Sequence, residues 1–399
     1  MAEVAVTLEE IRLTKKHLKS WMKPKTVKTP FVLWPAKSQI HTDPLGVVLI
    51  IGPWNYPFQL MMAPLIGALA AGNCALLKPS ELSPNTSDLL FELIPKYFEK
   101  TYVSIVGGGV PETTELLKLP FDHIFFTGSP KVGKVVMEAA AKHLTPVTLE
   151  LGGKSPAVVC EDADLEITAR RLVWGKFYNA GQTCVAPDYL LVQKSIKERL
   201  IEEIKKALQE QFGQNPKESS SFARIINRKN FERLVALLPN QKVIQGGSSD
   251  GDQLFIEPTL LIEVKWSDDV MKEEIFGPLL PILEFNEFSE AIDQINHQPK
   301  PLAAYLFTQS KSQKDQFLDS VSFGGGCMND VMVHLSNPHL PFGGVGNSGM
   351  GSYHGINSFL TFSHQKSVLF RSKYLDWSFR YAPYTKNKIK ILKLALGLK

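Results

Sequence analysis

The sequence is poor in cysteine and has no marked excess of charge of either sign. Its four cysteines are widely spaced, without a CxxC pair or a histidine at zinc-ligand spacing: Cys74, Cys160, Cys184 and Cys327. This spacing argues against a disulfide framework and against a zinc module, so we expect no metal. The net charge of +4 is small for 399 residues and is spread along the chain, so we expect no nucleic-acid binding.

The sequence also lacks a recognisable secretory signal and a membrane span. It opens MAEVAVTLEE, with acidic residues where a signal would carry basic ones, and with no apolar core segment. We therefore expect a cytoplasmic, reducing location. The most apolar stretch, residues 46–72, contains Pro53, Pro57 and Pro64, which divide it into a strand, a turn and a helix.

The C-terminal tail departs from this plain composition. Residues 386–399, KNKIKILKLALGLK, alternate lysine with isoleucine and leucine. Such a segment is too short to span a bilayer, which needs about 20 apolar residues. Two interpretations stay open: a basic amphipathic helix in weak contact with a membrane surface, or a solvated terminal helix.

What the sequence does contain is a regular alternation of strand-like and helix-like segments. GVVLIIGPWN, from Gly46, is typical of a strand buried on both faces, and helical composition follows it. Repeated alternation with short connections predicts a doubly wound parallel sheet over residues 1–151, whose ligand binds beyond the carboxyl ends of the strands. A second α/β series follows over residues 152–341.

Two strand ends in the first series carry residues suited to a dinucleotide. Gly128 and Ser129 lead into a helix, with Gly133 one turn on, so backbone amides there can hold a phosphate. GSPKVG is not GxGxxG, and on the local sequence alone a plain strand-to-helix turn is the favoured interpretation. Lys78 and Glu81, in KPSE, can bind the hydroxyls of a ribose, although a solvated ion pair before a helix fits the local sequence too.

Glu150 and Cys184 are the candidate catalytic residues. Glu150 ends an apolar strand in TLELGGKSP, where burial would raise the pKa of a general base; the alternative is a cap or a pair with Lys154. Most lone cysteines are small buried hydrophobes, and Cys74 and Cys160 fit that role. Cys184 lies instead in the polar loop NAGQTCVAP, where backbone amides can stabilise a thiolate and an oxyanion. Together they suggest aldehyde oxidation through a thioester.

At this point the motifs resemble those of a known family. LELGGKSP and NAGQTCVAPDY are similar to the two active-site signatures of the aldehyde dehydrogenases. GPWNYPF, KPSE, FTGSPKVG, EEIFGP and PFGGVGNSGMGSYHG match further family segments in the same order, and the last resembles class 3, the fatty-aldehyde type. The resemblance runs from about Leu8 to Lys366. It implies a Rossmann-type sheet, a second α/β catalytic domain and a small bridging element for oligomerisation.

The resemblance also implies roles for single residues. Cys184 would be the nucleophile, Glu150 the general base, and Asn55 an oxyanion-hole donor beside the Cys184 N–H. The implied cofactor, NAD or NADP, would be bound by Trp54, Lys78, Glu81, Gly128, Ser129, Gly133, Glu274 and Phe276. The implied substrate tunnel would include Tyr56, Trp174 and His354, and the aromatic residues Phe177 and Tyr178 are either tunnel walls or ordinary core.

The implied activity is NAD(P)-dependent oxidation of medium- or long-chain aliphatic or aromatic aldehydes to acids. Glu150 disfavours a CoA-acylating or esterase activity, because CoA-acylating members generally lack this glutamate. The match begins within what is a later helix of class 3 members, which implies a short N-terminus and leaves a non-catalytic dinucleotide-binding protein as the alternative. A homodimer is implied, with a bridging segment at about residues 26–42, and residues 342–399 would return to the cofactor domain, the bridging arm and the tail.

Overall fold

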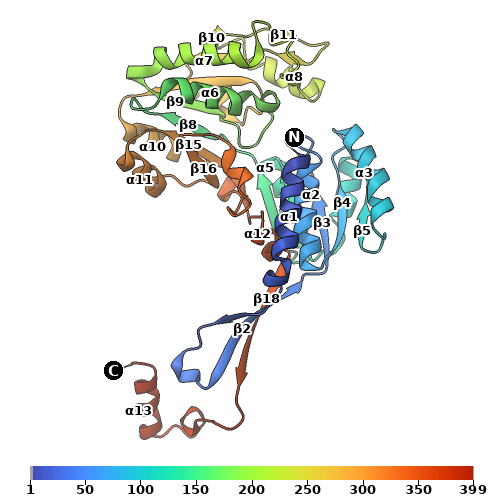
Figure 1. The fold of residues 1–399 in the computed structure, drawn as a ribbon, viewed down its shortest axis with the longest axis vertical. Helices are drawn as coiled ribbons and strands as arrows, with labels where there is room; N and C mark the ends of the chain where they lie inside the picture. The colour runs from blue at the N-terminus through green and yellow to red at the C-terminus, as the bar shows by residue number, and fades with distance from the viewer. Residues whose placement is uncertain (1–2, 399) are drawn as a thin grey trace.

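The computed structural model describes residues 3–398 as two α/β lobes and a projecting arm (Figure 1). The first lobe contains a six-stranded sheet in the order β17-β7-β6-β3-β4-β5. Its strands are β3 (Val47–Ile51), β4 (Cys74–Lys78), β5 (Val103–Ile105), β6 (His123–Gly128), β7 (Val147–Leu151) and β17 (Gly349–Met350). Five of them run parallel, whereas β17 pairs antiparallel with β7. The predicted doubly wound parallel sheet is confirmed.

Helices cover both faces of this sheet because its strands are apolar on both faces. Val48 and Ile50 of β3 belong to one buried cluster, and Leu49 and Ile51 belong to another. The helices of this lobe are α1 (Val4–Trp21), α2 (Gln59–Ala71), α3 (Pro84–Tyr97), α4 (Val110–Leu116), α5 (Pro130–Ala141) and α12 (Ile356–Thr361). Helix α1 packs along α2, so the first described segment is part of this lobe (Figure 1).

The second lobe contains a seven-stranded sheet in the order β10-β13-β14-β9-β8-β15-β16. Its strands are β8 (Pro156–Val159), β9 (Tyr189–Gln193), β10 (Lys242–Gln245), β13 (Thr259–Ile262), β14 (Leu279–Phe285), β15 (Ala303–Phe307) and β16 (Gly325–Met328). Only β10 runs antiparallel to its neighbour. The helices are α6 (Leu165–Phe177), α7 (Lys197–Phe212), α8 (Arg228–Val235), α9 (Asp269–Lys272), α10 (Phe288–Asn296) and α11 (Lys311–Ser320).

Short elements lie in the lobes, the arm and the C-terminal tail. They are the hairpin β11 (Ser249–Asp250) and β12 (Phe255–Ile256), and the 3₁₀ turns η1 (Phe31–Leu33), η2 (Tyr178–Gly181), η3 (Lys194–Ile196), η4 (Val333–Ser336), η5 (Gly346–Ser348) and η6 (Ser378–Arg380). The turn η2 follows α6 directly and belongs to the loop that carries Cys184. Residues of η4 line the same cavity as Cys184.

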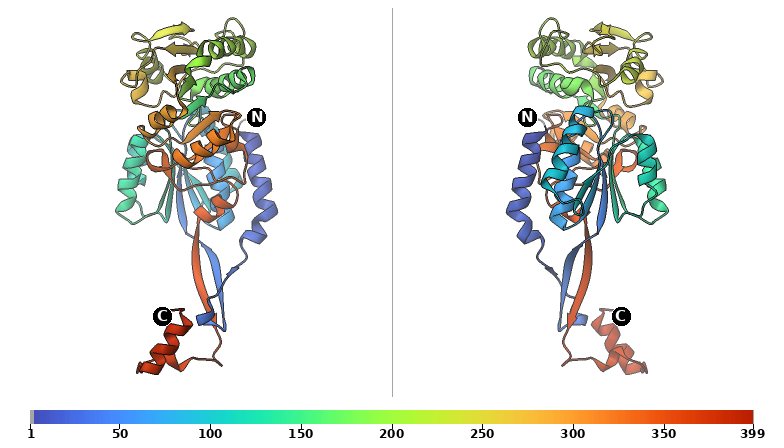
Figure 2. Two further views of the ribbon diagram at one scale, coloured as in Figure 1. Left: turned by 90° about the vertical axis from the view of Figure 1, so that its left-hand side faces the viewer. Right: turned by 90° about the vertical axis from the view of Figure 1, so that its right-hand side faces the viewer.

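The arm is a long antiparallel ribbon of β1 (Lys25–Val27), β2 (Ala36–Pro44) and β18 (Ser363–Arg371), seen from two sides in Figure 2. Strands β2 and β18 pair from Ser363 opposite Pro44 to Arg371 opposite Ala36. Helix α13 (Lys386–Ala395) lies beyond the ribbon and is largely exposed (Figure 1). In residues 3–398, each helix is too short or too polar to cross a membrane.

Candidate active site

A cavity of about 150 Å³ lies between the two lobes and has both Glu150 and Cys184 in its wall. The first lobe contributes Tyr56 and Glu150, and the second contributes Trp174 and Cys184. His354, which the sequence places in the glycine-rich stretch, lines the same cavity. Residues that lie far apart in the sequence therefore meet at one place, as expected at the carboxyl end of parallel strands.

Glu150 lies on β7, as the sequence predicts, and the residue is 3% exposed. Neither of its carboxylate oxygens has a hydrogen-bond partner in the described part of the chain. Burial therefore raises the pKa of Glu150 well above its usual range. The alternative of a pair with Lys154 is wrong, because the Lys154 ammonium binds Asp188 instead.

The loop that carries Cys184 has an unusual backbone. Asn179, Ala180 and Gly181 follow α6 with φ angles of 52°, 52° and 76°. A Cβ atom at Gly181 would lie 2.3 Å from the Gly277 carbonyl oxygen, so only glycine permits this approach. These three left-handed residues turn the chain sharply, and Cys184 emerges from the turn in the cavity wall.

The environment of Cys184 keeps its thiol protonated. Burial, together with the negative charges of Glu274 and Glu150, raises the pKa of the Cys184 thiol to about 12. A thiolate, the reactive form, therefore forms only when a neighbouring group accepts the proton. Glu150 lies in the same cavity wall, and neither of its carboxylate oxygens has a hydrogen-bond partner within residues 3–398. It is therefore the group best suited to accept the thiol proton.

Asn55 reaches the cysteine loop from the other lobe. Its Nδ2 donates to the Gln182 carbonyl oxygen at 3.1 Å, and the Asn179 Nδ2 donates to the Asn55 carbonyl oxygen at 3.1 Å. Next to it, the Tyr56 hydroxyl lies 2.6 Å from the Thr183 hydroxyl. These bonds join the loop after β3 to the loop before Cys184. A carboxamide carries two N–H donors, so one bond to Gln182 leaves a second donor for a ligand.

The adenosine-side candidates lie at the ends of β4 and β6. The Lys78 side chain is 3% exposed and its Nζ lies 3.7 Å from a Glu81 oxygen, so a fully solvated pair does not describe it. Ser129 caps α5 by accepting a hydrogen bond from the Val132 N–H at 3.4 Å. Gly133 has a packing role, because a Cβ there would lie 2.7 Å from a Leu151 methyl.

The nicotinamide-side candidates lie on the segment between α9 and β14. Burial, then the Asp188 charge, raises the pKa of Glu274 to about 8. Its carboxylate lies against the Gly152 backbone, where a Cβ would come within 1.9 Å of an oxygen. Phe276 has a φ of 50° and its ring meets that of Trp54 edge-on at 5.4 Å. The ammonium, carboxylate, helix terminus and aromatic pair are chemically suited to the ribose, phosphate and ring of a dinucleotide.

The sequence did not indicate how this segment is held. Lys154 Nζ binds Asp188 and donates to the carbonyl oxygens of Val270 at 3.0 Å and Glu273 at 2.9 Å. The other Asp188 oxygen accepts from the Ile275 N–H at 2.9 Å. The only early signal was position: Lys154 and Asp188 each stand four residues after a candidate catalytic residue.

The aromatic candidates separate into tunnel and core. Tyr56, Trp174 and Tyr178 line the cavity, whereas Phe177 is 1% exposed and packs on Phe212 at 6.5 Å. The sequence left these aromatic residues open between walls and core, and the structure contains both kinds. Between residues 3 and 398, no cluster of three or more His, Cys, Asp or Glu side chains is arranged to hold a metal ion.

Comparison with known proteins agrees with this geometry. The model of the aldehyde dehydrogenase family matches residues 1–368. The chain belongs to the aldehyde dehydrogenase family. It is 50% identical over 396 residues to aldehyde dehydrogenase family 3 member H1 of Arabidopsis thaliana, covering 98% of this chain and 82% of that protein.

The Arabidopsis family 3 relative, together with a rat relative, places this aldehyde dehydrogenase in class 3. It is 52% identical over 370 residues to the dimeric NADP-preferring aldehyde dehydrogenase of Rattus norvegicus, covering 93% of this chain and 82% of the relative. The substrate-bound structure of Staphylococcus aureus AldH matches with a TM-score of 0.96 and 49% identity, covering 99% of this chain and 86% of that one. The predicted family, fold and NAD(P)-dependent oxidation of aldehydes to acids are confirmed.

Proposed function

We propose that Cys184, Glu150 and Asn55 carry out this oxidation, on medium- or long-chain aliphatic or aromatic aldehydes. The observation that carries the proposal is the shared cavity, which is lined by a thiol and by a carboxylate that has no hydrogen-bond partner within residues 3–398. The remaining wall is largely apolar and includes Leu60, Val185 and Phe342, which suits a hydrocarbon substrate.

In the first step, Glu150 takes the thiol proton and the Cys184 sulfur forms a bond to the aldehyde carbon. The carbonyl oxygen becomes an oxyanion, and the Asn55 amide and the Cys184 N–H are the proposed donors to it. One such preorganised donor contributes about 3 kcal/mol to transition-state stabilisation. This places negative charge on oxygen and prepares the carbon to lose its hydrogen with the bonding electron pair.

The bound nicotinamide supplies the acceptor for that hydride. We propose that Lys78 and Glu81 hold the adenosine ribose, and that Gly128, Ser129 and the start of α5 face the pyrophosphate. Glu274, Phe276 and Trp54 would hold the nicotinamide end. The negative charge of Glu81 would repel the 2′-phosphate of NADP, so this residue favours NAD. The name of the rat relative records a preference for NADP in that protein.

Glu150 releases the thiol proton to solvent before the second half-reaction. It then removes a proton from water, and the water oxygen bonds to the thioester carbon. The carbon–sulfur bond breaks, the carboxylic acid leaves, and Cys184 recovers its proton. A buried carboxylate in this place supports hydrolysis rather than transfer to coenzyme A. We therefore expect turnover that does not depend on added coenzyme A.

We also propose a homodimer formed through the arm, since dimeric is part of the name of the rat relative. Helix α13 is a second, weaker surface: its exposed Lys386 and Lys390, with Ile389 and Leu394, suit contact with an anionic lipid surface. For location, we propose the cytoplasm, on the grounds of the N-terminal composition.

The first test is the absorbance of reduced nicotinamide when the protein meets NAD and a medium-chain aldehyde, beside Cys184→Ser. We expect turnover by the natural protein and none by the variant, with cofactor binding retained in both. Wild-type activity in Cys184→Ser would remove the thiol from the mechanism. A folded natural protein that binds NAD and turns over no aldehyde would favour the non-catalytic interpretation.

A further inference from the structure

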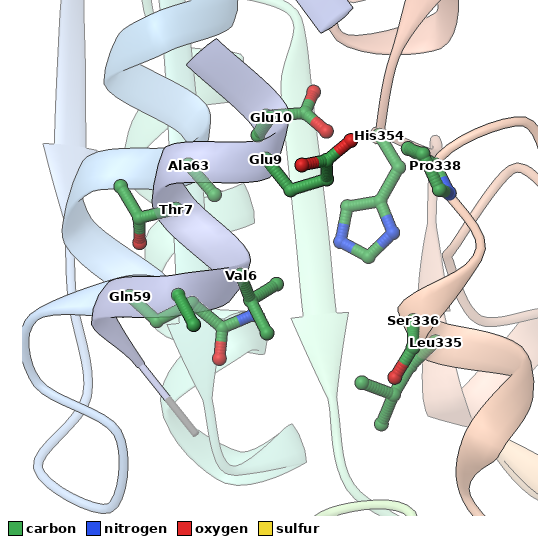
Figure 3. Close-up of a pocket in the computed structure, with 11 residues that line it drawn as sticks. Val6, Thr7, Glu9, Glu10, Gln59, Ala63, Leu335, Ser336, Pro338 and His354 are labelled. Atoms are coloured by element: carbon green, nitrogen blue, oxygen red, sulfur yellow. The ribbon is translucent and has the colours of Figure 1, made fainter. Parts of the chain in front are cut away.

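A second cavity, of about 220 Å³, adjoins the one that holds Cys184. It lies between α1 and the segment around residues 335–338, and Figure 3 shows the side chains that line it. Five residues line both cavities: Val6, Gln59, Leu335, Ser336 and His354. The two spaces therefore share one wall, and an elongated molecule bound at Cys184 has room beyond it.

Two residues of the shared wall are polar, buried and without a side-chain partner. Gln59 is 8% exposed and His354 is 5% exposed. Within residues 3–398, neither the Gln59 carboxamide nor the His354 imidazole makes a hydrogen bond, although the backbone of each does. Neither side chain is among the fully enclosed polar groups that lack a partner within residues 3–398, so their polar atoms are open to the cavity and can bond a ligand there.

Two carboxylates, Glu3 at the N-cap of α1 and Glu10 within the helix, hold the backbone next to both residues. The Glu3 carboxylate accepts the Phe58 and Gln59 N–H groups at 2.8 and 3.0 Å, which fixes the start of α2. The Glu10 carboxylate accepts the Gly355 N–H at 2.7 Å, beside His354. The shared wall is therefore preorganised, as a recognition site requires.

The His354 ring is also fixed by its neighbours. It stacks on Phe342 at 5.3 Å and meets Tyr353 at 4.4 Å, and the backbone N–H of His354 donates to the Ser358 hydroxyl at 2.8 Å. Burial, with a smaller contribution from His334, lowers the pKa of His354 to about 4. The ring is neutral at pH 7 and offers one donor and one acceptor.

The charge of the surroundings selects the kind of group that fits. Glu10 and Glu9 line the second cavity, so a carboxylate on the ligand would meet like charge. Neutral Gln59 and His354 offer no charge to compensate it. An uncharged oxygen that both donates and accepts hydrogen bonds suits both residues.

We propose that Gln59 and His354 form a distal subsite for a hydroxyl group on the far part of an elongated aldehyde. The substrate class is then the oxygenated aldehydes, such as hydroxyalkanals, rather than plain hydrocarbons. This inference rests on the proposed function, because it assumes that the aldehyde end lies at Cys184.

The test compares matched pairs of substrates, an alkanal and its ω-hydroxy counterpart, from six to twelve carbons. The measured quantity is the ratio of the two kcat/KM values at each length. At the lengths that reach the subsite, we expect the hydroxyl to be favoured about 2- to 12-fold, the range of one neutral hydrogen bond. Gln59→Met and His354→Phe, which keep size and remove the polar atoms, should each reduce the ratio.

Control variants keep the comparison specific. Gln253→Leu and His339→Phe change the same residue types at exposed positions and should leave the ratio as it is. The ratio cancels any general loss of activity in a variant. A natural protein with no hydroxyl preference at any length would overturn the proposal, and so would a preference that both subsite variants keep.

A binding measurement separates this proposal from the proposed function. Calorimetric titration with 1,8-octanediol and 1-octanol, and with shorter and longer pairs, reports the subsite without turnover. Diol preference that Gln59→Met reduces supports the subsite even if no aldehyde is oxidised, in which case the proposed function alone fails. Equal affinity for diol and alcohol at every length would overturn the subsite.

Discussion

Glu150 is buried, and its carboxylate has no hydrogen-bond partner in residues 3–398. It also lies in the same cavity wall as the candidate nucleophile, Cys184. An unpaired buried carboxylate is costly to ionise, so it holds its proton to higher pH than an exposed one. Such a group accepts a proton readily near neutral pH, which is the property that a general base for water needs.

We therefore expect Glu150→Gln to lose both the acceptor of the thiol proton and the base for water, so that formation and hydrolysis of the thioester both slow. Rapid mixing with NAD and aldehyde should give reduced cofactor without a fast burst, at a steady rate about 100-fold or more below that of the natural protein. In the natural protein, the hydrolysis rate should rise with pH through a midpoint well above the usual carboxyl pKa, since only ionised Glu150 is a base.

The matched control is Glu138→Gln, which removes an exposed carboxylate on α5. It should keep both the steady rate and the pH profile. A Glu150→Gln protein that hydrolyses the thioester at the natural rate, or that keeps the same pH limb, would show that another group is the base.

At residue scale, the sequence predicted the residue types of the site better than their partners. Glu150 on an apolar strand and Cys184 in a polar loop follow from local composition. The partner of Lys154 does not, because Asp188 is 34 residues away and reaches it only through the fold. Gln59 and His354 gave no local signal as a pair, since one starts a helix and the other follows a glycine-rich loop.

At the scale of elements, one buried ion pair connects three segments of the site. Lys154 follows β7, Asp188 precedes β9, and their bonds reach the segment between α9 and β14. Arg233 of α8 adds a bond to the Ile275 carbonyl oxygen at 2.7 Å. The three N–H donors of the Lys154 ammonium are all used, so the pair is well satisfied. Removing Lys154 alone would leave the Asp188 charge buried and unpaired.

Lys154→Met should therefore weaken the hold on Glu274 and Phe276. We expect the KM for NAD to rise about tenfold or more, with a smaller change in the KM for aldehyde, because an uncompensated Asp188 disturbs the cofactor-side segment first. Adding Asp188→Asn to Lys154→Met should recover part of the loss, and a double-mutant cycle measures that coupling.

The matched control is Lys118→Met, which removes an exposed lysine paired with Glu115 at 2.5 Å. Surface pairs of this kind contribute about 0–1 kcal/mol, so its kinetics should not change. Equal rises in both KM values, or additive effects in the cycle, would contradict a specific role in holding the cofactor-side segment.

Element predictions succeeded where burial leaves a clear pattern. Strands such as β3 and β4 are continuous apolar runs, and the amphipathic α7 repeats apolar residues at helical spacing. The stretch GGGCMND, residues 324–330, carries no such pattern. Part of it forms β16, because a Cβ at Gly326 would lie 2.1 Å from the Ala304 carbonyl oxygen and glycine alone allows that pairing.

At the scale of the whole molecule, the arm is the part that the two lobes do not explain. It projects from the first lobe as a ribbon (Figure 2). Within it, Lys366 bonds Asp43 at 2.6 Å across 323 residues of sequence. No composition signal links segments so far apart, and only the family resemblance indicated the bridging hairpin. A small ribbon of strands is only marginally stable alone, so we expect the arm to pack against another protein surface.

The apolar side chains of the arm indicate that surface. Phe31 is 85% exposed, Trp34 is 58% exposed and Phe370 is 48% exposed. Clustered exposed apolar groups of this kind mark protein interfaces. We therefore expect sedimentation equilibrium to give twice the chain mass, and the double variant Phe31→Glu with Phe370→Glu to shift the protein toward the chain mass, because charge at a buried interface is costly.

Val110→Glu changes a side chain that is 76% exposed on α4, away from the arm, and should leave the dimer intact. A natural protein that sediments at the chain mass, or an arm variant that stays dimeric, would move the interface elsewhere. Because the arm lies apart from the cavity, the monomeric variant should keep its affinity for cofactor even where it loses stability.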